Sequence, residues 1–459
     1  MGVPEGFLDE IRNIVGSQHV LTEVDVVSGY TTDWTGRFVG ASPAVIRPAD
    51  TAEVTAVVQA CRRHGTPVVP QGGNTGLVGG SVPLGGEVVV STERMTAIAD
   101  VDPDAGQLTA GAGATLVEVQ RAADEVGWRY AVDFAARDSA TVGGMVATNA
   151  GGVRVFRHGS TRRQVLGVEA VTGAGDVISR LGGLVKDNTG YDLGGLFCGS
   201  EGTLGIVCRA RLALVPPVVG SVVALVGFAD LDAALVATGR LRRAVPGLEA
   251  VELVLADGAA MVAEQSGVAA GLDPMPPVQL VMEAAGPPDP TAALGDAISS
   301  LAGVIDVAVA EDARGRRALW HVREAHTESI ARLGTPLKYD VTLPAPVFAS
   351  FCTAIPARIE EAAPSADVWL FGHVADGNVH VNVTGHEDDG PTVRRISDVV
   401  LSTVDLAGGS VSAEHGIGTA KSDWLPVNRG DADVQTMAAV KRALDPDSIC
   451  NPAALIPRR

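Results

Sequence analysis

Three glycine-rich runs in the first half of the chain place the strongest constraint on its fold. Each is flanked by short predicted strands: QGGNTGLVGGSVP (71–83), SATVGGMVATNAGGVRVFRHGS (139–160) and KDNTGYDLGGLFCGSEGTLGIV (186–207). Glycine lets the backbone approach a ligand closely and turn its amides towards an anion such as a pyrophosphate. The first run has neither the Rossmann spacing G-x-G-x-x-G nor the P-loop ending G-K-[ST]. Alone it would fit an ordinary glycine-rich hairpin, but three separated runs favour an extended ligand, and a long dinucleotide such as FAD meets that requirement.

Length and charge narrow the classes of protein further. A chain of 459 residues exceeds what one core usually supports, so two or three domains are expected. The formal charge of -19 argues against nucleic acid as a partner. Five scattered cysteines without a CxxC pattern fit a reducing compartment. The acidic, amphipathic first residues resemble neither a signal nor a transit peptide, and no apolar run is long enough to span a bilayer, so a cytoplasmic location is expected.

Hydrophobic periodicity predicts different element patterns in the two halves. TAEVTAVVQACRRHG predicts a helix with Thr51 as candidate cap and Gly65 as its end. In the second half, strands at 221–228, 248–256, 277–284 and 305–311 alternate with helices near 230–243 and 290–301. This order predicts a ferredoxin-like antiparallel sheet covered by helices, acting as a lid. Residues 267–277 predict a surface loop.

The stretch HVADGNVHVN (373–382) carries two histidines across a tight DGN turn. Strand alternation after the turn puts Asn378, His380 and Asn382 on one face and the valines on the other. Glu414 in SAEHGIG can supply a carboxylate, and two imidazoles plus one carboxylate leave a divalent ion with open positions for substrate. Zinc suits His373, His380 and Glu414, with manganese or iron as alternatives. His415 would then be a base, whereas the simpler alternative is that these are hydrogen-bonded loop histidines.

Basic residues precede this stretch. Arg323 and Thr327 are four positions apart on one predicted helix and so face the same way. Lys338 begins the predicted strand KYDVTLP. For any one of these residues, a solvated surface position is the default interpretation.

Six motifs in a fixed order resemble a known family. PVVPQGGNTGLVGG, VGGMVATNAGG, KDNTGYDL and GSEGTLGI resemble the flavin-binding, PCMH-type domain of the vanillyl-alcohol-oxidase flavoproteins. HVADGNVHVN and SAEHGIG resemble the metal motifs of the branch with D-2-hydroxyglutarate dehydrogenases, D-lactate dehydrogenases and glycolate oxidase D subunits. The resemblance implies an α+β fold with a two-subdomain FAD-binding domain (1–217). It also implies a substrate or cap domain with the metal site (218–415) and a carboxyl-terminal helical segment that returns to the FAD domain (416–459).

The resemblance also implies which residues hold FAD. The first run would wrap the pyrophosphate, the second would follow the rest of the cofactor, and residues of the third run and the tail would complete the site. Those residues are Gln71, Gly72, Gly73, Asn74, Thr75, Gly76, Leu77, Ser139, Gly143, Gly144, Thr148, Asn149, Gly152, Glu201, Ile206 and Asn451. Some relatives attach FAD through a histidine or cysteine of the first run, where this chain has Asn74 and no cysteine. We therefore expect non-covalent FAD.

The implied activity is oxidation of a small anionic D-2-hydroxy acid to the 2-oxo acid by hydride transfer to FAD N5. Arg323, Thr327 and Lys338 match the substrate positions of D-2-hydroxyglutarate dehydrogenases, and Asn382 would help to fix the substrate. The lactate and glycolate branches keep the arginine and lack the lysine, so D-2-hydroxyglutarate is the preferred substrate and a D-2-hydroxy monocarboxylate the alternative.

Several alternatives stay open at this level. The electron acceptor could be an electron-transfer flavoprotein, a quinone, a cytochrome or oxygen, and a homodimer is compatible with the sequence. A flavin-free zinc hydrolase or metal-binding protein is a rival from another class. A binding protein with a relict site is a third, against which the intact His373, His380, Glu414 and His415 argue.

Overall fold

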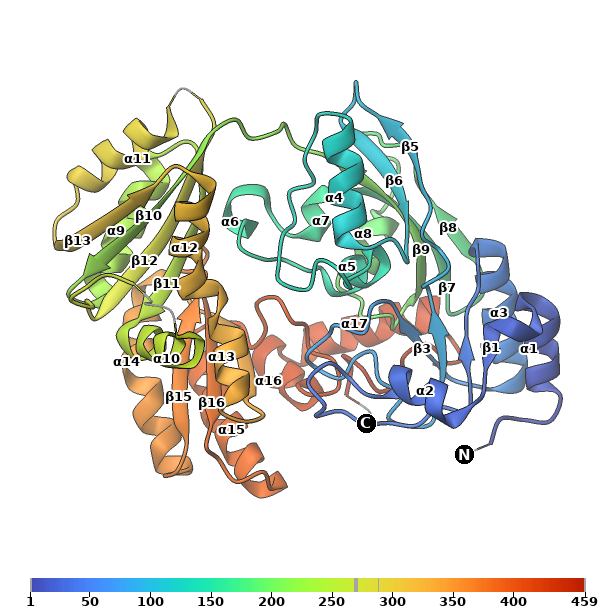
Figure 1. The fold of residues 1–459 in the computed structure, drawn as a ribbon. Coiled ribbons are helices and arrows are strands. Elements are labelled where there is room, and N and C mark those ends of the chain that lie inside the picture. Colours follow the sequence, from blue (N-terminus) through green and yellow to red (C-terminus); the bar gives the residue numbers. More distant parts are fainter. Residues whose placement is uncertain (1, 268–270, 288, 458–459) are drawn as a thin grey trace. The chain divides into compact units, whose positions relative to one another are not determined.

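The computed structural model describes residues 2–267, 271–287 and 289–457, which divide into two compact units (Figure 1). Unit 1 comprises Met1–Gly152, His158–Pro217 and Glu414–Arg459, and unit 2 comprises Val153–Arg157 and Val218–Ala413. The three predicted functional domains stay predictions. The loop predicted at 267–277 lies partly outside the described residues, and residues 271–277 contain no helix or strand. Within the described ranges, no helix combines the length and apolar character needed to cross a membrane.

The first sheet of unit 1 has the strand order β1-β2-β4-β3. Strands β2, β3 and β4 are parallel, whereas β1 is antiparallel to β2. The elements around it are α1 (Phe7–Val15), η1 (Ser17–His19), β1 (Val20–Leu21), α2 (Val24–Thr31), β2 (Val45–Ile46), α3 (Thr51–His64), β3 (Val68–Gln71) and β4 (Val88–Ser91). Helix α3 ends at Gly65 with φ 59°, as predicted. The prediction of Thr51 as its cap is wrong, because the Asp50 side chain accepts from Glu53 N and Thr51 is already helical.

The second sheet of unit 1 is antiparallel, with the order β5-β6-β9-β7-β8. Helix α4 begins in a reciprocal capping box between Thr115 and Glu118. The elements are β5 (Ile98–Asp102), β6 (Gln107–Gly111), α4 (Leu116–Glu125), α5 (Val142–Thr148), α7 (Thr161–Gln164), β7 (Val165–Thr172), β8 (Val177–Ser179), α8 (Leu193–Phe197) and β9 (Gly205–Ala213). Helix α6 (Val155–His158) spans the boundary of the two units.

The end of the chain returns to the first sheet of unit 1. It contains η2 (Ser422–Trp424), α16 (Leu425–Arg429) and α17 (Asp431–Leu444). Val68 N of β3 donates to Ile449 O, and Asn451 N donates to Val68 O, each at 2.8 Å. The carboxyl-terminal segment therefore pairs with β3, a strand near the beginning of the chain. These hydrogen bonds join the first and last segments of unit 1.

Unit 2 is built on a seven-stranded antiparallel sheet with the order β13-β10-β12-β11-β15-β16-β14. Its first four strands in the chain take the spatial order 4-1-3-2, so the ferredoxin-like prediction is confirmed. The elements are β10 (Ser221–Phe228), α9 (Leu231–Ala244), β11 (Leu248–Leu255), α10 (Ala256–Ser266), β12 (Val278–Ala285), α11 (Pro290–Ser299), β13 (Val304–Ala310), α12 (Ala313–Glu324), α13 (His326–Arg332), β14 (Leu337–Thr342), α14 (Ala345–Ala362), β15 (Asp367–Gly372), β16 (Asn378–Thr384) and α15 (Gly390–Leu406).

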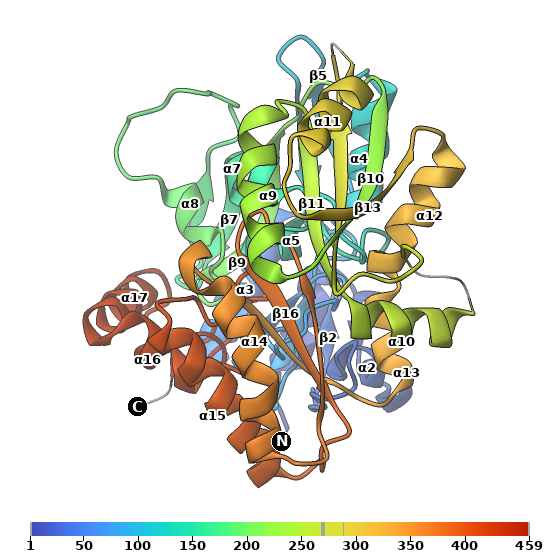
Figure 2. The same cartoon turned by 90° about the vertical axis from the view of Figure 1, so that its left-hand side faces the viewer.

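Helices cover both faces of this sheet. Helices α9, α11, α14 and α15 contact one another in one layer, and α10, α12 and α13 contact one another in a second. Figure 2 shows α9 and α14 on one side of the strands and α12 and α13 on the other. The sheet is therefore buried on two sides, and polar groups on its faces need partners inside the protein.

Candidate functional site

A row of polar side chains crosses one face of the sheet in unit 2. Antiparallel pairing of β14 with β16 sets Lys338 opposite Asn382 and Asp340 opposite His380. The intervening valines of β16 are fully buried on the opposite face. A shift of one residue would move His380 into that core, so the apolar pattern fixes the register and thereby the histidine.

His373 is brought to the same place by the turn before β16. Gly377 takes φ 81°, which favours glycine, and Asn378 N donates to His373 O at 3.2 Å. The ring centroids of His373 and His380 are 5.2 Å apart, and their candidate ligand atoms lie within 4.8 Å of one another. The predicted pair of convergent imidazoles is present within unit 2.

Each of the two imidazoles has a buried carboxylate at its Nδ1 atom. His373 Nδ1 lies 2.7 Å from Glu252 Oε1, and His380 Nδ1 lies 3.4 Å from Asp340 Oδ1. Asn378 Nδ2 donates to the same Asp340 oxygen at 2.6 Å, which fixes that carboxylate. A carboxylate at Nδ1 holds the proton there and leaves the lone pair on Nε2, the arrangement typical of metal-binding histidines. The donor set therefore fits a divalent ion.

Burial and charge act together on these groups. Burial would raise the pKa of Glu252, but His373 and Arg323 outweigh it and the net pKa is lowered, so Glu252 is ionised. Burial lowers the pKa of His380 despite the opposing Asp340. A neutral imidazole beside an ionised carboxylate is the state in which histidine coordinates metal.

Arg323 lies beside the histidine pair. Its Nε is 2.8 Å from Glu252 Oε2, and its Cζ lies 4.5 Å from the centroid of the Phe371 ring. Burial lowers the pKa of Lys338. Asn382 Nδ2 is buried and has no hydrogen-bond partner among the residues that the structure describes. This face of unit 2 therefore presents two cations and an amide donor near two imidazoles.

Thr327 does not share a helix with Arg323, so that prediction is wrong. Helix α12 ends at Glu324 and α13 begins at His326. Ala325, between them, has a ψ of -11°, which departs from the α-helical value of about -42° and interrupts the helix. Thr327 is half-buried in the first turn of α13. No glycine or proline marks this break in the sequence, which explains why the helical periodicity alone missed it.

The fully buried His326 predicts a pH-dependent stability. Burial, aided by Arg323, lowers its pKa to about 3. The unfolded chain takes up a proton below about pH 6.5 and the folded chain does not, so the free energy of unfolding should fall as pH drops from there towards 3. The expected loss is about 2 kcal/mol near pH 5. Urea unfolding of wild type and His326→Leu across this range should show the shallower pH dependence in the variant; equal slopes would contradict the assignment.

In unit 1, the first and second glycine-rich runs approach each other closely. A Cβ at Gly72 would lie 2.1 Å from Thr141 Oγ1, and a Cβ at Gly73 would lie 1.7 Å from Ser139 O. Thr141 Oγ1 and Ser200 Oγ are buried without a hydrogen-bond partner among the described residues. A tight backbone cradle with spare hydroxyl groups fits a phosphate-containing ligand.

Several polar side chains assigned to FAD hold the loops in shape. Gln71 Nε2 donates to Tyr30 O and Ser81 O, each at 2.8 Å. Asn74 has φ 52° and donates to Thr32 O, so its amide supports the loop. The remaining assigned residues of the first two runs lie in the same loops or in α5: Thr75, Gly76, Leu77, Ser139, Gly143, Gly144, Thr148 and Asn149.

The third run meets the EHGIG turn. Glu201 is buried with φ 52°, and its carboxylate accepts from Ile417 N at 2.7 Å and Gly418 N at 2.6 Å. Burial raises the pKa of Glu201 against these hydrogen bonds. Asn451 Nδ2 donates to Gly80 O and Glu201 O, each at 2.7 Å. These two side chains fix loops, and Ile206 lies in the apolar core of unit 1; their predicted FAD contacts stay predictions.

Glu414 and His415 belong to unit 1 and follow directly after Ala413 of unit 2. Gly152 N donates to Glu414 Oε1 at 2.6 Å, which links a residue assigned to FAD with a residue assigned to metal. Ala413 N donates to Asp340 O at 3.1 Å. The chain thus passes Asp340, the partner of His380, one residue before Glu414.

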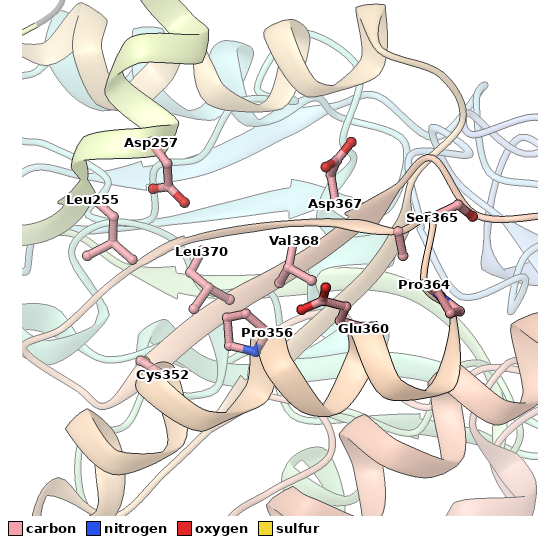
Figure 3. A pocket seen from close by; sticks show the side chains of 11 residues that line it. Leu255, Asp257, Cys352, Pro356, Glu360, Pro364, Ser365, Asp367, Val368 and Leu370 are labelled. Atoms are coloured by element: carbon pink, nitrogen blue, oxygen red, sulfur yellow. The ribbon is translucent and has the colours of Figure 1, made fainter.

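A cavity of about 410 Å³ lies on the other face of the unit 2 sheet (Figure 3). Leu370 and Val368 of β15 line it, together with Cys352, Pro356 and Glu360 of α14. Leu370 and Phe371 are adjacent in the strand and so point to opposite faces. The cavity is therefore separate from the histidine pair.

Glu252 and Asp340 were missed by the sequence reasoning. Each is an acidic residue inside an apolar predicted strand, LEAVELVLA and KYDVTLP. A carboxylate on a strand that is buried on two sides requires a charged or hydrogen-bonding partner. That pattern was a usable signal for both residues.

Comparison with known proteins identifies the family. Residues 42–180 match the FAD binding domain family, and residues 220–455 match FAD linked oxidases, C-terminal domain. A D-2-hydroxyglutarate dehydrogenase of Xanthomonas citri pv. viticola is 37% identical, covering 97% of this chain and 96% of that protein. The mitochondrial D-2-hydroxyglutarate dehydrogenase of Bos taurus is 36% identical, covering 99% of this chain and 84% of that protein.

A solved structure supports the same fold. p-Cresol methylhydroxylase with substrate bound has a TM-score of 0.79 at 18% identity, covering 99% of this chain and 98% of that chain. The predicted α+β, two-subdomain FAD-binding architecture is confirmed. The chain belongs to the family of FAD-linked oxidases that includes the D-2-hydroxyglutarate dehydrogenases.

Proposed function

We propose that this protein oxidises D-2-hydroxyglutarate to 2-oxoglutarate with non-covalent FAD and a divalent ion. The observation that carries the proposal is the pair of cations, Arg323 and Lys338, beside two imidazoles on one sheet face. Lys338 is paired with Asn382, two residues beyond His380, and Arg323 shares Glu252 with His373. The relatives named D-2-hydroxyglutarate dehydrogenases support the same substrate.

His373, His380 and Glu414 would hold the divalent ion, zinc by preference or else manganese or iron. The carboxylates at both Nδ1 atoms support this assignment, because they present Nε2 as the ligand atom. When bound, the ion supplies Lewis acidity at the substrate hydroxyl and FAD supplies the hydride acceptor. Gln71–Leu77, the residues assigned in the second run, Glu201, Ile206 and Asn451 would form the FAD site.

The remaining residues would bind and deprotonate the substrate. His415 accepts the proton of the 2-hydroxyl oxygen on a ring nitrogen, as a general base. Arg323, Thr327 and Lys338 hold the distal carboxylate, and Asn382 donates its buried Nδ2 to the substrate. A buried Arg323 and a partly buried Lys338 suit a dicarboxylate, since placing a partly desolvated cation opposite a methyl group would be costly.

Changing Lys338 to alanine should separate dicarboxylate from monocarboxylate substrates. We expect kcat/KM for D-2-hydroxyglutarate to fall about 10²- to 10³-fold, because one partner of a desolvated charge pair is removed. Turnover of D-lactate should change by less than about threefold, and Lys338→Arg should retain more dicarboxylate activity than alanine. Steady-state kinetics on both substrates provides the measurement. Equal losses on both would overturn the proposed specificity in favour of a D-2-hydroxy monocarboxylate.

The electron acceptor, the homodimer and the cytoplasmic location stay predictions from the sequence. The acceptor classes to compare are an electron-transfer flavoprotein, a quinone, a cytochrome and oxygen. Activity assays with each class as the sole oxidant distinguish them.

A further inference from the structure

Glu252 of β11 joins the two halves of the candidate site. Its carboxylate is fully buried, with Oε1 2.7 Å from His373 Nδ1 and Oε2 2.8 Å from Arg323 Nε. We propose that Glu252 is a positioning residue that couples metal binding by His373 to recognition of the substrate carboxylate by Arg323. This inference rests on the proposed function, because it gives His373 and Arg323 their roles.

The complete burial of Glu252 indicates that its carboxylate has a specific role. An ionised carboxylate in the interior is costly unless its charge is paired and its oxygens are engaged. Here each oxygen is used by a different residue, and both of those residues belong to the candidate site. Sheet geometry supports the placement, since Val254 pairs with Phe371 and Phe371 pairs with His380. Glu252, two residues before Val254, points to that same face.

For His373, the contact selects the tautomer. A carboxylate accepts a hydrogen bond and cannot donate one, so the imidazole carries its proton on Nδ1. The Nε2 lone pair then points away from Glu252 and can bind a metal ion. Carboxylate partners of this kind also orient the ring and raise its basicity.

For Arg323, the contact fixes the plane of the guanidinium. Glu252 Oε2 forms an ion pair with Nε on one edge of the guanidinium, and the centroid of the Phe371 ring lies 4.5 Å from Cζ. Because Glu252 faces Nε, this ion pair leaves the edge of the guanidinium that carries the two Nη atoms unused. The guanidinium can therefore present two parallel N–H groups to a carboxylate, the geometry that arginine uses for bidentate recognition.

A neutral amide cannot replace this carboxylate. Glutamine offers one acceptor oxygen and one donor nitrogen, whereas Glu252 faces a ring nitrogen of His373 and the cationic Nε–H of Arg323 with one carboxylate oxygen each. In Glu252→Gln, one of the two donors must face an NH2 group. Either His373 loses its Nδ1 acceptor or Arg323 loses its counter-charge, so both functions are weakened together.

The test compares FAD-loaded wild type, Glu252→Gln and a matched control, Glu249→Gln. Glu249 lies in the same strand and is also buried, but its neighbours at 3.8 Å are Arg154 and Arg157. Zinc affinity is measured by competition with a chelator, and KM is measured for D-2-hydroxyglutarate. Glu252→Gln should bind zinc about 10- to 100-fold more weakly and raise KM about tenfold or more, with FAD content unchanged. Glu249→Gln should match wild type in both.

The outcomes separate this inference from the proposed function. If wild type binds no stoichiometric metal and its flavin is not reduced by D-2-hydroxyglutarate, the proposed function fails. If wild type does both and folded Glu252→Gln keeps wild-type zinc affinity and KM, the positioning role is overturned. A change in KM with unchanged zinc affinity would also overturn the coupling.

A second variant and a wild-type measurement cover the case in which Glu252→Gln does not fold. Glu252→Asp keeps the charge but is one methylene shorter, so it cannot reach both partners and should show both losses. In zinc-loaded wild type, 15N-histidine NMR should show His373 protonated at Nδ1 and coordinated through Nε2. Coordination through Nδ1 would overturn the proposal without any variant.

Discussion

Replacing His380 by alanine should lower kcat for D-2-hydroxyglutarate by about 10³-fold or more while FAD stays bound. His380 lies in β16 opposite Asp340, and its ring is 5.2 Å from that of His373. Under the proposed function, removing one of the two imidazoles would leave too few ligands to hold the divalent ion that would polarise the substrate hydroxyl. Anaerobic stopped-flow measurement of flavin reduction, together with metal analysis, should show lost metal and lost reduction in parallel.

The matched control for that variant is His386→Ala. His386 lies just beyond β16, and its Nδ1 lies 3.0 Å from the carbonyl oxygen of the neighbouring Glu387. It should keep wild-type metal content and rate. If His380→Ala retains both, His380 is not a ligand and the metal assignment must be abandoned.

Replacing His415 by alanine should lower the rate of flavin reduction by about 10²- to 10⁴-fold, the usual contribution of a general base. His415 follows Glu414, whose carboxylate is held by Gly152 N at 2.6 Å. Because His415 is assigned to the proton and not to the ion, the variant should keep FAD and metal at wild-type stoichiometry. Metal analysis of the same sample that is used for stopped flow makes this comparison direct.

These two histidine variants distinguish ligand from base. Loss of metal in His415→Ala would make His415 a ligand, and an unchanged reduction rate would remove it from the reaction. Retention of metal with loss of rate, opposite to the pattern in His380→Ala, is the result that the assignment requires.

Local patterns predicted much of the fold and of the site. The predicted strand SVVALVGF has the same first and last residues as β10. The alternation in NVHVNV correctly placed His380 and Asn382 on one face of β16 and the buried valines on the other. Both succeed because apolar periodicity and a Gly377 turn are properties of neighbouring residues. The ferredoxin-like order followed from the succession of strands and helices.

Other features depend on contacts distant in sequence. Glu252 meets His373 across 121 positions, and only the register of β11 with β15 shows that they touch. Residues 153–157 belong to unit 2 although the chain around them belongs to unit 1, which no local pattern indicates. The cap at Asp50 was missed because the adjacent Asp50 and Thr51 are both good helix caps, and the break at Ala325 was missed because no glycine or proline marks it.

Anaerobic flavin reduction in wild-type protein tests the central claim most directly. FAD- and metal-replete protein is mixed with D-2-hydroxyglutarate and, separately, with D-lactate, while the flavin absorbance is followed. The proposed function predicts rapid bleaching by D-2-hydroxyglutarate and slow or no bleaching by D-lactate. A yellow, metal-loaded protein that D-2-hydroxyglutarate does not bleach would contradict it.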